Sequence, residues 1–361
     1  MKRYLVEREL IQNNIQVLQK KAGSAMIWAV LKGNGYGLGL LPMAEVCREA
    51  GLGHFAVTEV SEAKALREGG FETEPILMLQ PTADADEITQ LLPLHVTFTV
   101  SSSEDASVLA GLAAQAGVTA EAHIKIDTGM GRYGFLPGEL EKITPVYSYM
   151  DSIHVTGIYT HLHSAFCSKK ATRAQIEAFS RVLNALREAG IEPGMAHILN
   201  SAGLLHFSGA AMDAVRVGSA LLGRVHGGHG LKKVGLCQTQ VEELKWLPKG
   251  STTGYGAGWK ARKPTRVAIL PVGWYNGFGC EMGNDLFRFR DCARNILKNL
   301  RIMLFGKAYY VTINGKRCRV LGHIGMLHTA ADVSKIQCSP GDPAAVEINP
   351  LMQKGMDVVW Q

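Results

Sequence analysis

Eight apolar runs alternate with helical stretches in the first two thirds of the sequence, and this alternation constrains the fold more than any other feature. The runs occupy residues 26–31, 54–58, 75–79, 95–100, 120–126, 153–160, 195–199 and 214–222. Helices are predicted among others at residues 11–21, 60–70, 104–117 and 170–190, and the last two end in glycine, as a helix C-terminus prefers. Eight strands separated by helices in about 200 residues is the count expected for a (β/α)8 barrel of the TIM type. An open doubly wound sheet also alternates, so it is the number eight that favours the barrel.

The alternation stops at a glycine- and histidine-rich connector, residues 223–235. Beyond it, strand-like runs at residues 265–274 and 308–320 follow without regularly intervening helices. The second run contains Asn314-Gly315, which between two alternating segments predicts a β-hairpin. We therefore expect an α/β chain with a barrel over residues 1–230 and a mostly-β domain over residues 231–361. Residues 1–10 are candidates to pair with the β domain.

Composition excludes several classes of protein. The chain is 47% hydrophobic and 19% charged, which is typical of a globular protein, and no run approaches the length that spans a bilayer. Seven scattered cysteines without a C-x-x-C pair favour free thiols in a reducing cytoplasm. The first ten residues are charged and lack the apolar core of a secretory signal. The net charge of +6 is mild for 361 residues and by itself says little about nucleic acid, although it would suit a small anionic ligand. We expect a small-molecule substrate, no nucleic-acid partner and, since no segment could span a bilayer, no membrane partner.

A single lysine, Lys32, stands between the first apolar run and a loop with four glycines in seven residues. The glycines do not form G-x-G-x-x-G, and the lysine precedes them, so a nucleotide-binding loop is not indicated. A lysine at the end of a barrel strand would lie on the face where barrel active sites form. Desolvation there lowers the pKa of the amine and makes it a nucleophile and a base. The alternative is a strand-end lysine that extends to solvent.

Other polar residues follow the same pattern, because they come at the ends of later runs. Four of the predicted strands end in such residues: Lys125, Asp127 and Arg132; His161; Asn200 and Ser201; Arg216, Gly218 and Ser219. The carboxyl ends of barrel strands meet on one rim. The sequence therefore predicts one functional pocket there.

These segments, taken together, resemble the alanine racemase family of barrel-fold enzymes that depend on pyridoxal 5'-phosphate. The segments AVLKGNGYG, KIDTGMGR, YTHLHS, LNSAG, RVGSALLG and GYGAGW occur in the family's order, and PVGWYNGF and GHIGMLH are weaker matches. The resemblance covers nearly the whole chain. It implies an isomerase that interconverts L- and D-alanine, serves D-alanine biosynthesis and acts as a homodimer with shared active sites.

The resemblance assigns two bases, Lys32 and Tyr255, to opposite faces of the cofactor imine. Lys32 would hold the cofactor and move the α-proton on one face, while Tyr255 of the partner subunit would serve the other face. A phenol titrates near ~10 in water, so a tyrosine base needs nearby cations. The family's candidates for these cations are His161 and Arg216.

The remaining cofactor contacts are also implied by the resemblance. Arg216 would face the pyridine nitrogen, and because a guanidinium keeps its proton, it would hydrogen-bond the ring without protonating it. The cofactor phosphate would be held by hydroxyls and backbone N–H groups. The implied cofactor-binding set comprises Lys32, Tyr36, His161, Asn200, Ser201, Arg216, Gly218 and Ser219.

Arg132 and the backbone N–H of Met326 would bind the substrate carboxylate, and Lys125 matches a position that is carbamylated in many members. The sequence departs from the family mainly in its C-terminal domain, at Trp274, Tyr275, Asn276, His323, Gly325, Leu327, His328 and Trp360. These departures leave other readings open. The chain could accept serine or a larger amino acid, be a decarboxylase or an aldolase on the same scaffold, or bind the cofactor without catalysis.

No metal site is predicted. His161, His163 and Cys167, and likewise His226 with His229, lack a complete ligand spacing. A basic insert at residues 286–301 has no counterpart in the family; it is interpreted as an amphipathic, solvated segment, with a partner-binding or anion-binding surface as the alternative.

Overall fold

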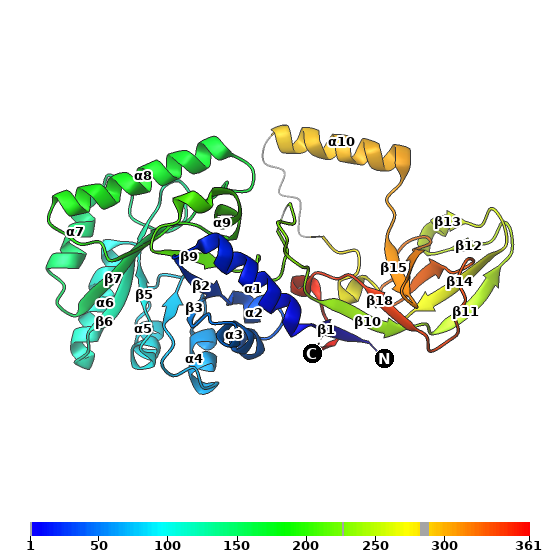
Figure 1. Cartoon of the computed structure of the whole chain (residues 1–361), viewed down its shortest axis with the longest axis horizontal. Helices are drawn as coiled ribbons and strands as arrows, with labels where there is room; N and C mark the ends of the chain where they lie inside the picture. The colour runs from blue at the N-terminus through cyan, green and yellow to red at the C-terminus, as the bar shows by residue number, and fades with distance from the viewer. Residues whose placement is uncertain (1, 226, 282–288) are drawn as a thin grey trace. The chain divides into compact units, whose positions relative to one another are not determined.

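The fold was analysed in a computed structural model that describes residues 2–225, 227–281 and 289–361, with only the backbone of Arg290. The chain divides into two compact units. The barrel unit spans Glu7–Val234, and the C-terminal unit spans Gly235–Gln361 together with the N-terminal strand β1 (Arg3–Val6). Figure 1 labels their elements.

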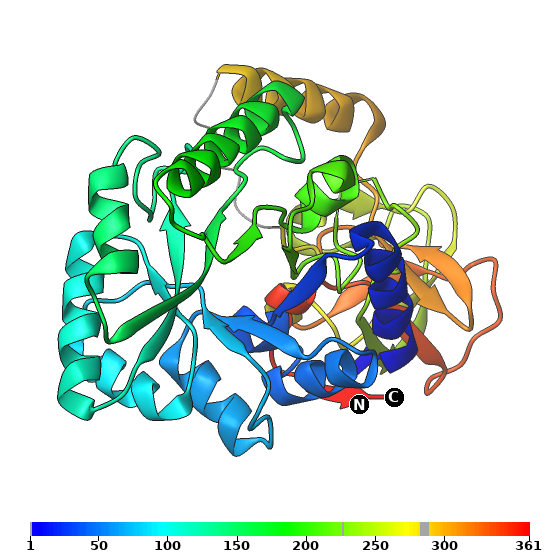
Figure 2. The same cartoon turned by 60° about the vertical axis from the view of Figure 1, so that its left-hand side comes forward.

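The barrel unit contains the eight expected strands in one parallel sheet, seen within a ring of helices in Figure 2. They are β2 (Met26–Val30), β3 (His54–Val57), β4 (Ile76–Met78), β5 (Phe98–Val100), β6 (Ala120–Ile126), β7 (Ile153–Thr160), β8 (Met195–His197) and β9 (Ala214–Val217). Their order is β4-β3-β2-β9-β8-β7-β6-β5, and backbone hydrogen bonds of Thr97 to Ile76 and Met78 join the two end strands. The predicted fold class is confirmed.

Helices connect successive strands on the outside of the sheet. They are α1 (Arg8–Ala22), α3 (Leu40–Glu49), α4 (Val60–Glu68), α5 (Ala85–Leu91), α6 (Ser103–Ala116), α7 (Leu140–Ser148), α8 (Lys169–Glu188) and α9 (Ser201–Phe207). Local sequence explains their ends. Ser102 caps α6 by accepting from the Asp105 N–H, and Gly117 ends the same helix in the left-handed conformation that glycine tolerates best.

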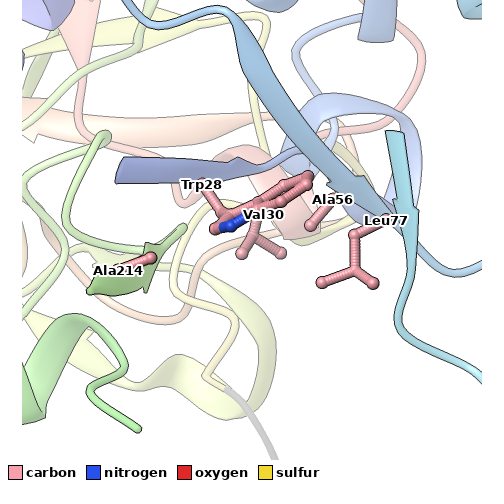
Figure 3. Close-up of a cluster of buried hydrophobic side chains, with 5 residues drawn as sticks. All are labelled: Trp28, Val30, Ala56, Leu77 and Ala214. Carbon is pink, nitrogen blue, oxygen red and sulfur yellow. The ribbon is translucent and has the colours of Figure 1, made fainter. Parts of the chain in front are cut away.

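The interior of the barrel is filled by side chains of neighbouring strands. Figure 3 shows Trp28 and Val30 of β2 against Ala56 of β3, Leu77 of β4 and Ala214 of β9. All five are buried, and burial of a large apolar side chain of this kind stabilises a fold by about 1.5–3 kcal/mol. Small residues opposite Trp28 leave room for its indole, so the barrel is a packed core and not a pore.

The C-terminal unit is mostly β. A six-stranded sheet has the order β16-β15-β18-β10-β1-β19, a three-stranded sheet has the order β11-β14-β17, and β12 pairs with β13. The bounds are β10 (Leu236–Gln240), β11 (Glu243–Leu247), β12 (Thr252–Thr253), β13 (Trp259–Lys260), β14 (Thr265–Leu270), β15 (Tyr310–Ile313), β16 (Lys316–Arg319), β17 (Thr329–Asp332), β18 (Pro343–Val346) and β19 (Asp357–Trp360). Short 3-10 turns lie at Leu92–Leu94, Ser208–Ala210, Tyr255–Ala257, Trp274–Asn276 and Pro350–Met352.

Three local expectations can be compared with the C-terminal unit. The predicted hairpin is confirmed, since Asn314 and Gly315 take left-handed φ angles of 48° and 72° between the paired strands β15 and β16. Strand β1 pairs with β10 and β19, so the first residues do join the β domain. The insert forms helix α10 (Phe289–Phe305), although residues 286–288 lie outside the described residues.

Two further expectations concern the chain as a whole. All seven cysteines have free thiols, as expected. Among the described residues, no helix is both long enough and apolar enough to cross a membrane.

Candidate active site

Lys32 begins a tight left-handed turn, labelled α2 (Lys32–Tyr36), directly after strand β2. Gly33, Asn34 and Gly35 have φ angles of 66°, 54° and 62°, and Tyr36 follows at 56°. Side chains other than glycine and asparagine rarely adopt this conformation. At Gly35 a Cβ would also collide with Met43. The glycines therefore let the chain reverse at the rim of the barrel, which brings Lys32 and Tyr36 to the same pocket.

Glu62 of α4 holds this turn in place. Its buried carboxylate accepts from the Asn34 N–H at 3.0 Å and from the Thr58 N–H, also at 3.0 Å. Asn34 in turn accepts from the Leu40 N–H, which joins the turn to the start of α3. The turn is thus linked to the ends of two strands, β2 and β3.

One pocket of about 540 Å³ lies at the carboxyl ends of the barrel strands. Ten of the twelve predicted site residues line it: Lys32, Tyr36, Lys125, Arg132, His161, Asn200, Ser201, Arg216, Gly218 and Ser219. They come from five places in the barrel, after or near the ends of β2, β6, β7, β8 and β9. The other two, Tyr255 and Met326, belong to the C-terminal unit.

The charges in the barrel pocket are mostly positive. Burial, together with the nearby Arg132, lowers the pKa of Lys32 from its ordinary value, and Glu62 partly opposes this. Burial and the nearby guanidinium groups lower the pKa of Lys125 to about 8. Lowered pKa values leave a larger fraction of each amine neutral near physiological pH, which is the form that acts as a nucleophile or a base. The excess of positive charge suits an anionic ligand.

Asp127 shapes the loop that carries Arg132. One carboxylate oxygen accepts from the N–H groups of Gly129 at 2.9 Å and Met130 at 2.7 Å, while the other accepts from the Arg132 N–H at 3.0 Å. The guanidinium of Arg132 lies over the ring of Tyr133. The backbone is therefore fixed at the root of Arg132, while its side chain stays exposed.

Arg216 is buried, and hydrogen bonds within the protein hold its two terminal nitrogens in place. One terminal nitrogen donates to Nδ1 of His197 at 2.8 Å and the other donates to the Thr160 carbonyl at 2.7 Å. Burial lowers the pKa of Arg216 to about 10, so the group stays protonated at neutral pH. Within the described part of the chain its Nε–H has no hydrogen-bond partner. This N–H is thus available to a ligand in the pocket that Arg216 lines.

Two buried histidines continue this hydrogen-bond chain into the barrel. Because His197 accepts from Arg216 at Nδ1, its Nε2 must carry the proton that reaches Nδ1 of His123, 2.9 Å away. Burial and the charge of Arg216 hold the pKa values of both imidazoles far below 6.5, to about 3 for His123. Both histidines are therefore neutral, and they orient Arg216 without adding charge.

The opposite end of the pocket presents hydroxyls. Ser201 Oγ accepts from the N–H groups of Gly218 at 3.0 Å and Ala220 at 3.3 Å, which leaves its own O–H free to donate. The Tyr36 hydroxyl packs directly on Gly218, where any Cβ would collide with it. Burial raises the pKa of Tyr36 to about 12, so the phenol also remains a donor. Convergent donors of this kind fit a phosphate group.

The resemblance offers His161 as a cation beside the tyrosine base. Burial, with the nearby Arg216 and Lys125, lowers the pKa of His161 to about 3, which favours a neutral imidazole in this chain. Its role beside Tyr255 stays a prediction. Arg216 remains a cation, as described above.

Asn200 and Gln175 fix the segment that carries His161. The Asn200 amide caps α9 through the Gly203 N–H and donates to the Leu162 carbonyl at 3.0 Å. Gln175 of α8 donates to the His161 carbonyl at 3.1 Å and accepts from the His163 N–H at 3.0 Å. The amide of Asn200 is thus used largely within the protein, although the residue lines the pocket.

A second pocket, of about 520 Å³, lies in the C-terminal unit and contains Tyr255 and Met326. Tyr255 is 76% exposed, in a tight turn between strands β12 and β13. Met326 accepts through its carbonyl from the Tyr275 N–H, and its own N–H has no partner among the described residues. This pocket therefore presents a phenol and a free backbone donor, the two groups that the resemblance assigns to proton transfer and carboxylate binding.

Half of the eight residues that depart from the family line this second pocket. Gly325, Leu327 and His328 line it, as does His323. Asn276 is fully buried and structural, because it accepts from the Gly273 N–H and donates to the Lys354 carbonyl. Trp274 is half exposed in the 3-10 turn that also holds Tyr275, and Trp360 ends β19.

The expectation that there is no metal site stays a prediction. No cluster of three potential metal ligands occurs among the residues that the structure describes. His226 lies outside them.

Several residues that build the pocket did not emerge from the sequence. Glu62, Gln175, His123, His197 and Thr160 support the groups that line the pocket, and none of them was predicted, although His197 and Thr160 are the last residues of β8 and β7. Glu62 had a local signal, since Glu59 and Glu62 form a capping box at the start of α4. The other four residues have no such local signal, because they meet their hydrogen-bond partners only in the folded chain.

Comparisons with known proteins decide the family. Residues 6–225 match the profile described as "Alanine racemase, N-terminal domain", and residues 234–350 match "Alanine racemase, C-terminal domain". The chain belongs to the alanine racemase family. Its relatives include the alanine racemase of Desulforamulus reducens, which is 34% identical over 92% of this chain and 85% of the relative. The alanine racemase of Methanococcus maripaludis is 30% identical over 92% of this chain and 84% of the relative.

Solved structures agree with this assignment at the level of the fold. The alanine racemase of Clostridium difficile 630 superposes with a TM-score of 0.79 at 24% identity, covering 96% of this chain and 86% of the other. The alanine racemase of Bacillus anthracis, solved with bound L-Ala-P, has a TM-score of 0.76 at 24% identity over 97% and 91% of the two chains.

Proposed function

We propose that this protein is an isomerase that interconverts L- and D-alanine with pyridoxal 5'-phosphate, using Lys32 and Tyr255 as its two bases. The observation that carries the proposal is the barrel pocket, where ten residues of the family's pattern converge in a chain that belongs to the alanine racemase family. A decarboxylase or an aldolase would need only one of the two bases.

The barrel pocket fits the cofactor. When bound, pyridoxal phosphate supplies the electron sink that makes the α-proton of an amino acid acidic enough for a side chain to remove. Lys32 would hold it covalently, the free Nε–H of Arg216 would face the pyridine nitrogen, and the hydroxyls of Tyr36 and Ser201 would bind the phosphate with Gly218 and Ser219. His161, which lines the same pocket, would contact the cofactor as a neutral imidazole.

Arg216 sets the character of the reaction. It keeps its proton at neutral pH, and hydrogen bonds to Thr160 and His197 hold its two terminal nitrogens in place, while its Nε–H has no partner among the described residues. It would therefore donate a hydrogen bond to the ring nitrogen of the cofactor without transferring a proton to it. This limits the withdrawal of electrons and favours return of the α-proton over transamination.

Lys32 and Tyr255 would move the α-proton on opposite sides of the substrate. The lowered pKa of Lys32 provides the neutral amine that takes a proton. Tyr255 would come from the partner subunit of a homodimer, as the resemblance implies. Arg132 and the Met326 N–H would hold the substrate carboxylate, with carbamylated Lys125 steering Arg132. The amine of Lys125 suits that modification, because a pKa of about 8 leaves a substantial neutral fraction in a cytoplasmic setting.

A broader substrate range is the second candidate function. Ile269, Met326 and Leu327 give the pocket around Tyr255 apolar walls, and Leu327 stands where the family usually has an acidic residue. Leu327 in place of a carboxylate removes a negative charge from the pocket wall. The wall therefore no longer repels or orients a substrate through that charge. This favours acceptance of serine or of a larger side chain.

Incubation of the purified, cofactor-loaded protein with each L-amino acid, followed by chromatographic separation of enantiomers, tests both candidates. We expect D-alanine to accumulate until the two enantiomers are equal. Activity with serine or larger amino acids at a comparable kcat/KM would support the broader range. If no D-isomer forms from any amino acid, the proposed function is wrong and the chain binds the cofactor without catalysing racemisation.

Gly218→Ala should weaken cofactor binding. The new Cβ would displace the Tyr36 phenol from its place on Gly218, and overpacking of this kind costs ~1–3 kcal/mol, which corresponds to a loss of affinity of about fivefold to a hundredfold. Fluorescence titration of the apoprotein with pyridoxal phosphate measures the dissociation constant. Gly53→Ala is the matched control, because its Cβ would meet no atom within 4 Å. An unchanged dissociation constant for Gly218→Ala would contradict the assignment of this phosphate site.

A further inference from the structure

Helix α10 (Phe289–Phe305) has an apolar side and a basic flank. Phe289, Ile296, Leu300 and Met303 recur at spacings of three, four and seven residues, which places them on one side of a helix. Leu297 and Leu304 widen this side. The segment carries four cationic residues and one acidic residue, Asp291.

The apolar side of α10 is uncovered. Seven of its large hydrophobic side chains are exposed, among them Phe289 at 87%, Met303 at 73% and Leu304 at 71%. In Figure 1 the helix stands away from the strands of the C-terminal unit. A contiguous apolar surface of this kind marks an interaction site, since isolated exposed hydrophobic residues are ordinary but clusters are not.

The cations lie at the edge of this side. Arg294 precedes Leu297 by three residues and Arg301 follows it by four, so both border the apolar side at Leu297. Arg294 pairs with Asp291 at 2.9 Å and Lys298 pairs with Glu281 at 3.4 Å. Both ion pairs are exposed to solvent, and exposed ion pairs contribute little to stability. Arg294 and Lys298 can therefore leave their carboxylate partners and bind a lipid phosphate at a small cost in free energy.

We propose that α10 is an interfacial helix that docks this protein on anionic phospholipid surfaces. Phenylalanine, leucine, isoleucine and methionine side chains would enter the boundary between headgroups and acyl chains, where the bordering arginines and Lys298 reach lipid phosphates. Charge complementarity selects anionic lipid, because the cytoplasmic leaflet carries a negative surface potential that attracts clustered Lys and Arg. The flank opposite the cations carries uncharged Asn295 and Asn299, so the positive charge is gathered on one flank of the helix.

This inference revises the sequence-based expectation of no membrane partner, which rested on the lack of a spanning segment. It does not depend on the proposed racemase activity, because none of the residues of α10 lines either pocket. Docking would place the enzyme at a surface without changing its chemistry.

Co-sedimentation of the full, cofactor-loaded chain with vesicles tests the proposal. One set contains equal parts of phosphatidylglycerol and phosphatidylcholine, and the other contains phosphatidylcholine alone. We expect binding to the anionic set only, weakened by salt. The double variants Ile296→Gln with Leu300→Gln, and Arg294→Gln with Arg301→Gln, should each lower the partition coefficient by about tenfold or more.

Two controls make the outcome decisive. Asn299→Gln on the same helix and Tyr149→Gln, which removes an exposed aromatic ring of the barrel unit, should leave vesicle binding unchanged. Racemase activity should persist in all variants, which shows that they fold. Failure of the unaltered protein to bind anionic vesicles overturns the proposal, as does binding that both double variants retain. Self-association in ultracentrifugation that Ile296→Gln with Leu300→Gln abolishes, without vesicle binding, would instead assign this side to a contact between copies.

Discussion

Replacing Lys32 by alanine is expected to lower kcat for alanine racemisation by about ten-thousand-fold, since a positioned general base alone accounts for up to that factor. Lys32 would lose two roles at once, covalent attachment of the cofactor and proton transfer on one face. The side chain lies in the barrel pocket with a lowered pKa caused mainly by burial, so no water molecule reproduces its neutral amine at the same place. Measurement of kcat with saturating alanine and cofactor checks the size of the effect.

Chemical rescue and covalent labelling separate the role of Lys32 from misfolding. Added methylamine should restore part of the activity of Lys32→Ala, because a small amine can enter the space left by the side chain. Lys64→Ala is the matched control, since that amine bonds Gln90 at the surface of the barrel unit. Borohydride reduction of the unaltered protein should fix the cofactor on Lys32 alone. Label on Lys125 or on any other lysine would overturn the assignment.

The barrel could be predicted from sequence because its signals are local. Each parallel strand is buried on both faces and so reads as a continuous apolar run, and glycine ends helices such as α6 where the left-handed conformation is required. The hairpin at Asn314-Gly315 was predictable for the same reason. The strand order of the C-terminal sheets was not. For β1 only pairing with the β domain could be expected, and its partners β10 and β19 lie more than 230 positions away in the sequence.

Only the residues that line the barrel pocket directly could be predicted from the sequence. Residues such as Lys125 and Arg216 follow the rule that strand ends of a barrel share one rim. The residues behind the lining did not follow from this rule. Glu62 and Gln175 belong to helices, and His197 ends β8 but supports Arg216 from behind the pocket. The protonation state of His161 was also beyond the sequence. The resemblance offered His161 as a cation, whereas burial and the nearby cations lower its pKa to about 3.

Tyr255→Phe is expected to lower kcat/KM for racemisation by about a hundredfold to ten-thousandfold while leaving the fold intact. The change removes one hydroxyl from an exposed side chain, so it should cost little stability. L- and D-alanine have equal free energies in water, and the equilibrium constant is therefore one. It follows that kcat/KM must fall by the same factor in both directions, even though Tyr255 serves only one face.

Proton exchange in heavy water shows which half of the reaction survives in Tyr255→Phe. Lys32 should still remove and return the α-proton on its own face, so one enantiomer of alanine should acquire deuterium without inverting, while the other should not exchange. Tyr310→Phe is the matched control, because it removes another exposed phenol of the C-terminal unit outside the second pocket. Full racemisation by Tyr255→Phe in both directions would show that a different group is the second base. Loss of exchange from both enantiomers would show that Tyr255 is needed before either proton moves, which the two-base arrangement does not allow.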